Sequence, residues 1–242
     1  LFFSHVLSPT GMVLPAERLC AEARKRGILT VVDGAHAPAM IDLNLAKVNA
    51  DFYGANLHKW LLAPTGAGFL ALGPGQEDRL DPLHVSWGYH PTQNPVAAGI
   101  ELDRDARDAF GSTPRIRFLE FEGSRDAIPW LVVPDAIAFQ AELGWPAIRE
   151  RFAELSAYSR ARIRLPPATP SARGLHGAMT AFELPAGTDA VALRKALWAA
   201  RIEIPVVERP DRLLLRVSHH WYTTEAEIDR VADFVDHFLS SA

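Results

Sequence analysis

The segment that most restricts the fold is a short apolar run, ILTVVD, at residues 28–33. Its β-branched side chains favour a strand, and the absence of polar alternation is typical of a strand that is covered on both faces. Such strands occur in parallel sheets, where helices pack over both faces. The run therefore predicts a strand inside an α/β layer.

The neighbouring segments supply the other parts of such a layer. The chain opens on an apolar run that we expect to be another strand. Residues 15–26 are predicted to form a helix, with Pro15 in its first turn and Gly27 just after its end. Two more short strands are expected at residues 51–56 and 66–73. Strand, helix and strand in quick succession indicate an α/β domain.

The rest of the chain has a different pattern. Residues 74–112 are rich in Pro, Gly and polar side chains and are predicted to be loops, and residues 115–123 alternate as a strand or an extended arm would. Helices are then predicted at residues 134–143, 145–162, 189–202 and 223–239, and strands within residues 171–187 and at 212–218. The last helix is expected to be capped by Thr224 or Thr223.

This pattern predicts two domains. We expect a large α/β domain with a mostly parallel sheet over residues 1–140, and a small α+β domain over residues 141–242. At 242 residues the chain is long enough to bury a core in each of them.

Composition excludes several classes of protein. The net charge of −4 and the absence of a Lys/Arg-rich run argue against a nucleic-acid partner. No apolar run approaches the roughly 18 residues that would span a membrane. The opening residues lack the basic region and the cleavage site of a signal peptide. We therefore expect a cytoplasmic protein without a membrane partner.

Several conspicuous side chains favour a structural role. His219 and His220 are adjacent in the chain, so a strand cannot turn both toward one metal ion, and they are interpreted as loop residues. Cys20, the single cysteine, lies beside small and apolar residues of a predicted helix and is interpreted as a core residue. Trp60 is interpreted as a packing residue. No metal site is predicted.

Asp33 and Lys59 are the strongest candidates for chemistry. Asp33 ends the apolar strand, and Lys59 follows the next predicted strand by a few residues, so both should lie at the carboxyl edge of the sheet, where open α/β sheets bind ligands. A carboxylate beside a lysine suits pyridoxal phosphate (PLP), which needs a Schiff-base lysine and a partner for its ring nitrogen. The alternative is a surface ion pair or a helix cap.

The surrounding motifs favour PLP binding over a surface ion pair or a helix cap. They are SHVLSPTGMVLP, VVDGAHAPAMIDL, ADFYGANLHKWLLAPTGAGFL, EFEGSRDAIPWLVVPDAIAF and LLLRVSHHWYTTEAEID. In this order they resemble the PLP-dependent class V aminotransferase family, and within it the isopenicillin N epimerase-like branch. The resemblance spans almost the whole chain. It implies the α/β fold of the type I PLP enzymes, with a partial large cofactor domain and a small C-terminal α+β domain.

The resemblance implies a role for each cofactor-binding residue. Lys59 would be the Schiff-base lysine and Asp33 the partner of the pyridinium nitrogen. His36 would lie near the phenolic oxygen of the cofactor, and Asn56 and His58 would bind its phosphate.

The resemblance also places three residues farther along the chain or nearer its start. Ser8 matches a position that often contacts cofactor or substrate, and Arg216 matches an arginine that binds the substrate carboxylate. Ser124 matches a position that reaches the cofactor phosphate of the neighbouring subunit, so the resemblance implies a homodimer. Arg125 and Asp126, next to Ser124, are interpreted as an ion pair.

The implied function is a PLP-dependent reaction at the α-carbon of a small amino-acid-like substrate. The family's fold has a long N-terminal portion, and this chain starts at Leu1, near the middle of the implied cofactor domain. We therefore expect a fragment of a longer protein or a chain completed by another. Epimerisation or transamination is the favoured reaction. A C–S lyase or cysteine desulfurase-like activity and a catalytically inactive fragment are the alternatives.

Overall fold

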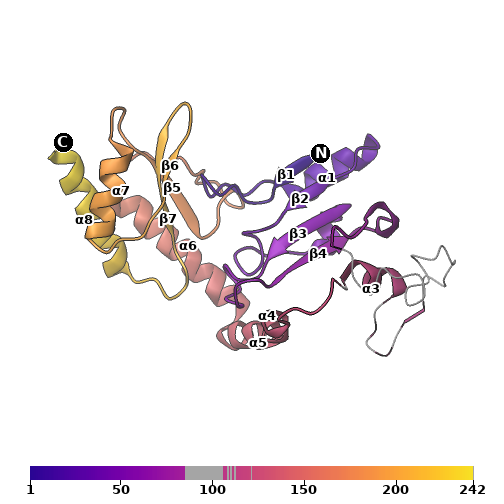
Figure 1. Cartoon of the computed structure of the whole chain (residues 1–242). Helices are drawn as coiled ribbons and strands as arrows, with labels where there is room; N and C mark the ends of the chain where they lie inside the picture. The colour runs from indigo at the N-terminus through magenta and orange to yellow at the C-terminus, as the bar shows by residue number, and fades with distance from the viewer. Residues whose placement is uncertain (85–105, 108, 110, 112, 121, 242) are drawn as a thin grey trace.

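The computed structural model describes residues 1–84, 106–107, 109, 111, 113–120 and 122–241. Most of the predicted loop at residues 74–112 lies outside these residues. Two separate sheets organise the described part of the chain, and the long helix α6 (Trp145–Arg162) runs from the neighbourhood of the first toward the second (Figure 1).

The first sheet has four strands in chain order, β1-β2-β3-β4. They are β1 (Phe2–Ser4), β2 (Val31–Asp33), β3 (Phe52–Asn56) and β4 (Gly68–Leu72). The first three are parallel, and their register places Ser4, Asp33 and Gly54 side by side. The prediction of a mostly parallel sheet is therefore confirmed.

The last strand of this sheet runs antiparallel to β3. Parallel strands need a crossover of about a dozen residues or more. The connection at residues 57–67 is shorter than that and folds back on itself, so β4 returns beside β3. The loop carries Lys59 and stays at the carboxyl end of β3.

Helix α1 (Ala16–Lys25) covers one face of the first sheet, and the short helix α2 (Leu45–Val48) lies beside α1. Cys20 of α1, Val32 and Tyr53 belong to the resulting core and are almost fully buried, which confirms the structural interpretation of Cys20. The opposite face carries Phe2 and Leu70, which are 70% and 53% exposed.

The second sheet has the order β5-β7-β6 and is antiparallel throughout. Its strands are β5 (Met179–Glu183), β6 (Val206–Glu208) and β7 (Leu213–Ser218), and the helices after α6 are α7 (Ala190–Ala199) and α8 (Glu225–Ser240). Phe182, Leu193, Leu215 and Val235 form a fully buried core between these strands and helices. β6 was not predicted because only three residues pair there.

Short helices connect the two sheets. They are the 3-10 turn η1 (Glu77–Arg79), α3 (Pro114–Glu120), α4 (Ile128–Leu131) and α5 (Val133–Leu143). Gly144 has a φ of +87°, ends α5 and begins α6 as predicted.

The prediction of a strand or extended arm at residues 115–123 is wrong, because α3 occupies most of it. Thr113 starts this helix: its hydroxyl accepts the amide of Ile116 at 3.2 Å, and its carbonyl accepts the amide of Arg117 at 3.0 Å. Ile116 and Leu119 are both half-buried, one helical turn apart. In so short a segment, alternation does not distinguish a strand from two helical turns.

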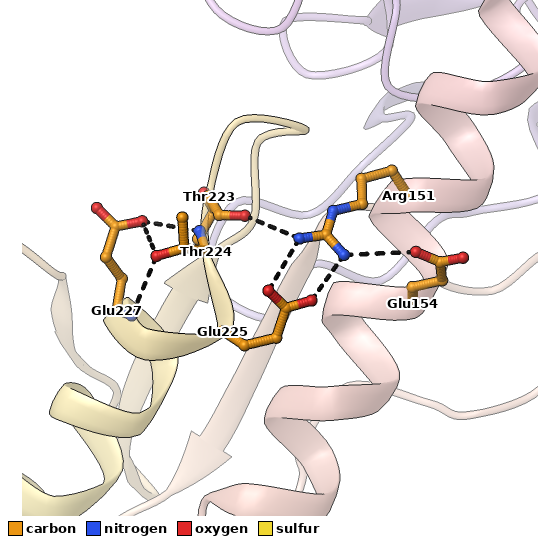
Figure 2. A network of polar contacts seen from close by, with 6 residues as sticks. All are labelled: Arg151, Glu154, Thr223, Thr224, Glu225 and Glu227. Atoms are coloured by element: carbon orange, nitrogen blue, oxygen red, sulfur yellow. Dashed lines mark hydrogen bonds and ion pairs between the residues drawn. The ribbon is translucent and has the colours of Figure 1, made fainter.

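Figure 2 shows how α8 begins. The Thr224 hydroxyl accepts the amide of Glu227 at 3.3 Å, and the Glu227 carboxylate accepts the amide of Thr224 at 2.8 Å. This reciprocal pair is a capping box, so Thr224 rather than Thr223 is the cap. Arg151 of α6 donates two hydrogen bonds to Glu225, at 2.7 and 3.2 Å, and holds α8 against α6.

No helix within the described ranges is long and apolar enough to cross a membrane.

We expect Thr224→Ala to lower the free energy of unfolding by about 1 kcal/mol, because the substitution leaves the first amides of α8 without the hydroxyl acceptor. Urea denaturation of the full chain would measure the change. Thr223→Ala is the matched control, since Thr223 contributes its carbonyl to Arg151 and not its side chain. Equal losses in the two variants would contradict the assignment of the cap.

Candidate active site

Asp33 lies at the carboxyl end of β2, where the sequence predicted it. One of its oxygens accepts the amide of Ala35 at 2.9 Å, and the other accepts the Ser4 hydroxyl at 3.2 Å. Ser4 reaches it because β1 and β2 are parallel and pair these two residues. These two hydrogen bonds fix the orientation of the Asp33 carboxylate at the carboxyl end of β2.

Gly34 explains why the chain can turn directly after Asp33. A Cβ built on Gly34 would lie 2.1 Å from the Tyr53 ring, so only glycine fits against this buried tyrosine. Tyr53 is fixed in turn by a 2.8 Å contact between its hydroxyl and Nδ1 of His5. The contact joins β3 to the residue after β1, and the sequence motifs give no sign of it.

Lys59 and His36 meet at this same edge. The distance between Lys59 Nζ and His36 Nε2 is 3.3 Å, and both side chains are half-buried. Asp33 ends β2, Lys59 lies just after β3, and these two strands are parallel. The prediction that Lys59 lies on the same edge of the sheet as Asp33 is therefore confirmed.

The surroundings favour the neutral forms of Lys59 and His36. Burial is the largest cause of the lowered Lys59 pKa; the Arg216 charge lowers it further, and the Asp33 charge opposes the change. Burial also lowers the pKa of His36 to about 4, with smaller contributions in the same direction from Lys59 and Arg216 and an opposing one from Asp33.

Trp60 has a polar contact as well as the packing role that the sequence predicted. Its indole nitrogen donates to Nδ1 of His36 at 3.2 Å. Its carbonyl accepts the side-chain amide of Gln140 at 3.0 Å and lies 3.3 Å from Nε2 of His220. Gln140 and His220 are far from Trp60 in the chain, so sequence motifs could not link them.

Arg216 comes from β7 of the second sheet and reaches the residues that follow β1. Its guanidinium donates to the carbonyl and to the hydroxyl of Ser8, each at 2.8 Å. The predicted residues Ser8 and Arg216 are therefore in direct contact. Burial lowers the Arg216 pKa, and its Nε is buried without a partner.

Asn56 and His58 flank the start of the lysine loop. Asn56 is the last residue of β3 and pairs with Gly68 of β4, and both Asn56 and His58 are half-buried. Nδ1 of His58 is buried and has no hydrogen-bond partner. An unsatisfied buried nitrogen beside Lys59 is a free polar group that a ligand could satisfy.

Ser124 is the predicted site residue that the structure does not bring to the others. It is exposed in the turn between α3 and α4. The interpretation of Arg125 and Asp126 as a pair is wrong: Arg125 pairs with Glu122 and stacks on Trp130, and the Asp126 carboxylate accepts the amide of Ile128.

His219 and His220 follow β7, as predicted, but both are buried rather than loop-exposed. Nε2 of His219 contacts the Ser159 hydroxyl at 3.0 Å, whereas His220 contacts Trp60. Burial is the main cause that lowers the His219 pKa to about 4, with a smaller contribution from Arg160. The two adjacent histidine rings therefore contact different residues.

Together these residues form a site with defined chemistry. A lowered pKa makes the neutral amine of Lys59 more accessible, and a neutral amine can act as a nucleophile or a base. The nearby carboxylate can pair with a protonated ring nitrogen, and the guanidinium with an anion. His58 Nδ1 and Arg216 Nε are buried without partners and could bind polar groups of a ligand. This donor set fits PLP.

Comparison with known proteins gives a consistent result. The family model described as "Aminotransferase class-V" matches residues 1–231. The chain is 56% identical to the isopenicillin N epimerase of Amycolatopsis lactamdurans over 96% of its length, and 53% identical to that of Streptomyces clavuligerus over 97%. The aligned regions span 58% and 59% of those two proteins.

A solved structure of the cystine C–S lyase C-DES has a similar fold. In it, glycine is covalently linked to the PLP cofactor of that protein. The TM-score is 0.76 at 21% sequence identity, and the match covers 97% of this chain and 60% of that one. This chain therefore spans less than two thirds of the length of all three proteins.

We expect the free energy of unfolding to fall as the pH drops from about 6.5 toward 4. His219 has a folded-state pKa of about 4, below the 6.5 of an unfolded histidine. In this window the unfolded chain binds more protons, so stability is full above pH 6.5 and is lost on acidification. His5 and His36, whose pKa values burial lowers to about 4, act in the same direction.

The contribution of His219 can be separated by substitution. We expect His219→Gln, which does not titrate, to reduce the slope of stability against pH by up to about 1.4 kcal/mol per pH unit. Urea denaturation at several pH values measures the slope. His237→Gln, on the exposed side of α8, is the control. Parallel curves for the His219 variant and the natural chain would refute the assignment.

Proposed function

This chain belongs to the class V aminotransferase family, and from that membership we propose that it serves a PLP-dependent enzyme that acts at the α-carbon of an amino-acid-like substrate. The reaction that we favour is an epimerisation of the isopenicillin N epimerase type. The observation that carries the proposal is the placement of Lys59, which lies 3.3 Å from His36 and has a pKa lowered by burial.

PLP, when bound, supplies an electron sink that stabilises negative charge at the substrate α-carbon. Lys59 is the amine that we propose holds the cofactor covalently and later moves a proton at the α-carbon. Asp33 would be the partner of the protonated ring nitrogen, because hydrogen bonds from Ser4 and Ala35 orient its carboxylate at this edge of the sheet. His58 and Asn56 would bind the phosphate, and the buried free nitrogen of His58 supports this role.

Arg216 would bind the substrate carboxylate. Its guanidinium is oriented by two hydrogen bonds from one terminal nitrogen to Ser8, and other nitrogens of the fork remain for an anion. Its positive charge also lowers the Lys59 pKa, which shows that the two groups sense one another electrostatically.

Two alternatives are kept. A C–S lyase or desulfurase-like reaction would use the same cofactor and the same lysine. A protein thiol for that reaction is not available from Cys20, which is fully buried on α1. The other alternative is a catalytically inactive fragment that does not bind PLP.

Further features of the enzyme belong to the same proposal. We propose that it works as a cytoplasmic homodimer in which the exposed Ser124 contacts the cofactor phosphate of the neighbouring subunit. We also propose that residues 1–140 and 141–242 are its two domains. Gel filtration of the purified chain would test the dimer.

We expect PLP added to the full chain to produce a visible absorption band that sodium borohydride removes, with the label on Lys59. Lys59→Ala should abolish the band, because the other three lysines, Lys25, Lys47 and Lys195, are exposed. Lys195→Ala is the matched control and should retain it. Absence of a band in the natural chain would overturn the proposal for this chain and favour the inactive fragment.

We expect Arg216→Lys to retain the PLP band but to require at least about tenfold more amino acid for half of the spectral change, because a single ammonium replaces a bidentate guanidinium. Titration of the PLP-loaded chain with an amino acid measures this. Arg212→Lys, at the exposed start of the same strand region, is the control. Unchanged half-saturation in the Arg216 variant would show that another residue binds the carboxylate.

A further inference from the structure

His36 has a polar neighbour on each of its two ring nitrogens. Nδ1 lies 3.2 Å from the indole nitrogen of Trp60, and Nε2 lies 3.3 Å from Nζ of Lys59. The imidazole is thus placed between a side chain that packs in the core and the amine at the centre of the site. The ring nitrogen that carries the His36 proton decides whether Lys59 can hydrogen-bond to His36 as a neutral amine or as an ammonium.

The indole of Trp60 settles the proton on His36. An indole N–H can only donate, so Nδ1 of His36 must accept. A neutral imidazole carries one proton, which then lies on Nε2 and points at Lys59. An ammonium has only donors, so it cannot accept that proton. A neutral Lys59 amine can accept it through its lone pair.

The opposite arrangement is blocked by the same geometry. A charged Lys59 could donate to Nε2 only if the His36 proton moved to Nδ1. That proton would then face the N–H of Trp60, and two donors would oppose one another at 3.2 Å. The Trp60 indole therefore prevents a charged Lys59 from donating a stabilising hydrogen bond to His36.

We propose that Trp60 is a positioning residue that fixes the tautomer of His36 and so favours the neutral, reactive amine of Lys59. The proposal rests on the proposed function in one respect, namely that the amine of Lys59 is the group that reacts. It assigns Trp60 a role that acts through His36 and needs no contact with cofactor or substrate.

Trp60 is held firmly enough for this role. Its side chain is 6% exposed, and its ring stacks on His220 with centroids 5.6 Å apart and planes 16° from parallel. Gln140 and His220 both contact its carbonyl. The amide of Trp221 donates to Nδ1 of His220, so the proton of His220 lies on Nε2 and points at that carbonyl.

The other charged groups around Lys59 act independently of Trp60. The Asp33 charge raises the pKa of Lys59, the Arg216 charge lowers it, and burial lowers it most. The same groups act on His36 in the same directions, together with Lys59 itself. A substitution that removes only the indole N–H leaves Asp33 and Arg216 in place, so its effect reports the tautomer.

The decisive experiment compares Trp60→Phe with the natural chain in the absence of PLP. Cyanate reacts with neutral amines, and peptide mass spectrometry gives the carbamylation rate of Lys59 at each pH. We expect the apparent pKa of Lys59 to rise by about one unit in the variant. At a given pH below this pKa, carbamylation of Lys59 should then be about tenfold slower. Exposed Lys25, Lys47 and Lys195 provide internal references.

Trp145→Phe is the matched control, because Trp145 packs partly buried in the same hydrophobic cluster as Trp60, whereas the indole hydrogen bond to His36 comes from Trp60. Its Lys59 profile should match that of the natural chain, and circular dichroism should show that both variants are folded. An unchanged Lys59 profile in Trp60→Phe would overturn the proposal.

A second measurement is made on the natural chain, with a variant used only to assign the resonance. Long-range ¹H–¹⁵N spectra of the natural chain at pH 7 should show the His36 proton on Nε2 and none on Nδ1. A His36→Gln spectrum identifies the resonance by its loss. A proton found on Nδ1 would overturn the proposal by itself. Neither measurement depends on PLP, so failure here and failure of PLP binding are distinguishable.

Discussion

The candidate site depends on the parallel register of β1, β2 and β3. This register sets Ser4, Asp33 and Gly54 level with one another, so the chain leaves β2 and β3 at the same edge of the sheet. This register alone places the Asp33 carboxylate and the loop that carries Lys59 at the same edge of the sheet. A shift by one residue would turn Asp33 into the mainly apolar core that α1 covers, where burying a carboxylate is costly.

The second sheet and the residues after it contribute further side chains to the candidate site. β7 brings Arg216 to Ser8, and the residues after β7 bring His220 to Trp60. The site thus holds an amine and a guanidinium, both partly desolvated, with Asp33 as the opposing charge. Burial is the main reason why the Lys59 pKa is lowered, and the positive charge of Arg216 lowers it further.

The sequence correctly predicted the long helices and the position of Lys59 on the same edge of the sheet as Asp33. Boundaries of α6 and the end of α5 were correct because Gly144 stops one helix and Pro146 suits the first turn of the next. α3 was mistaken for an extended segment, since alternation over a few residues is ambiguous and the cap at Thr113 decided it. β6 has three residues, too few for a periodic signal, and exists because β7 offers it a partner.

The sequence by itself determined the candidate residues: an aspartate at a strand end, a histidine three residues later, and a lysine in the loop after the next strand. These are local patterns, fixed by strand ends and turns. Only the tertiary structure decided how Lys59 is tuned. Trp60 is next to Lys59 in the chain, but Gln140 and His220, which contact the Trp60 carbonyl, come from distant segments. Arg216, whose charge lowers the Lys59 pKa, is also distant in the chain. Hydrogen-bond direction and desolvation are properties of the packed site, and no spacing along the chain encodes them.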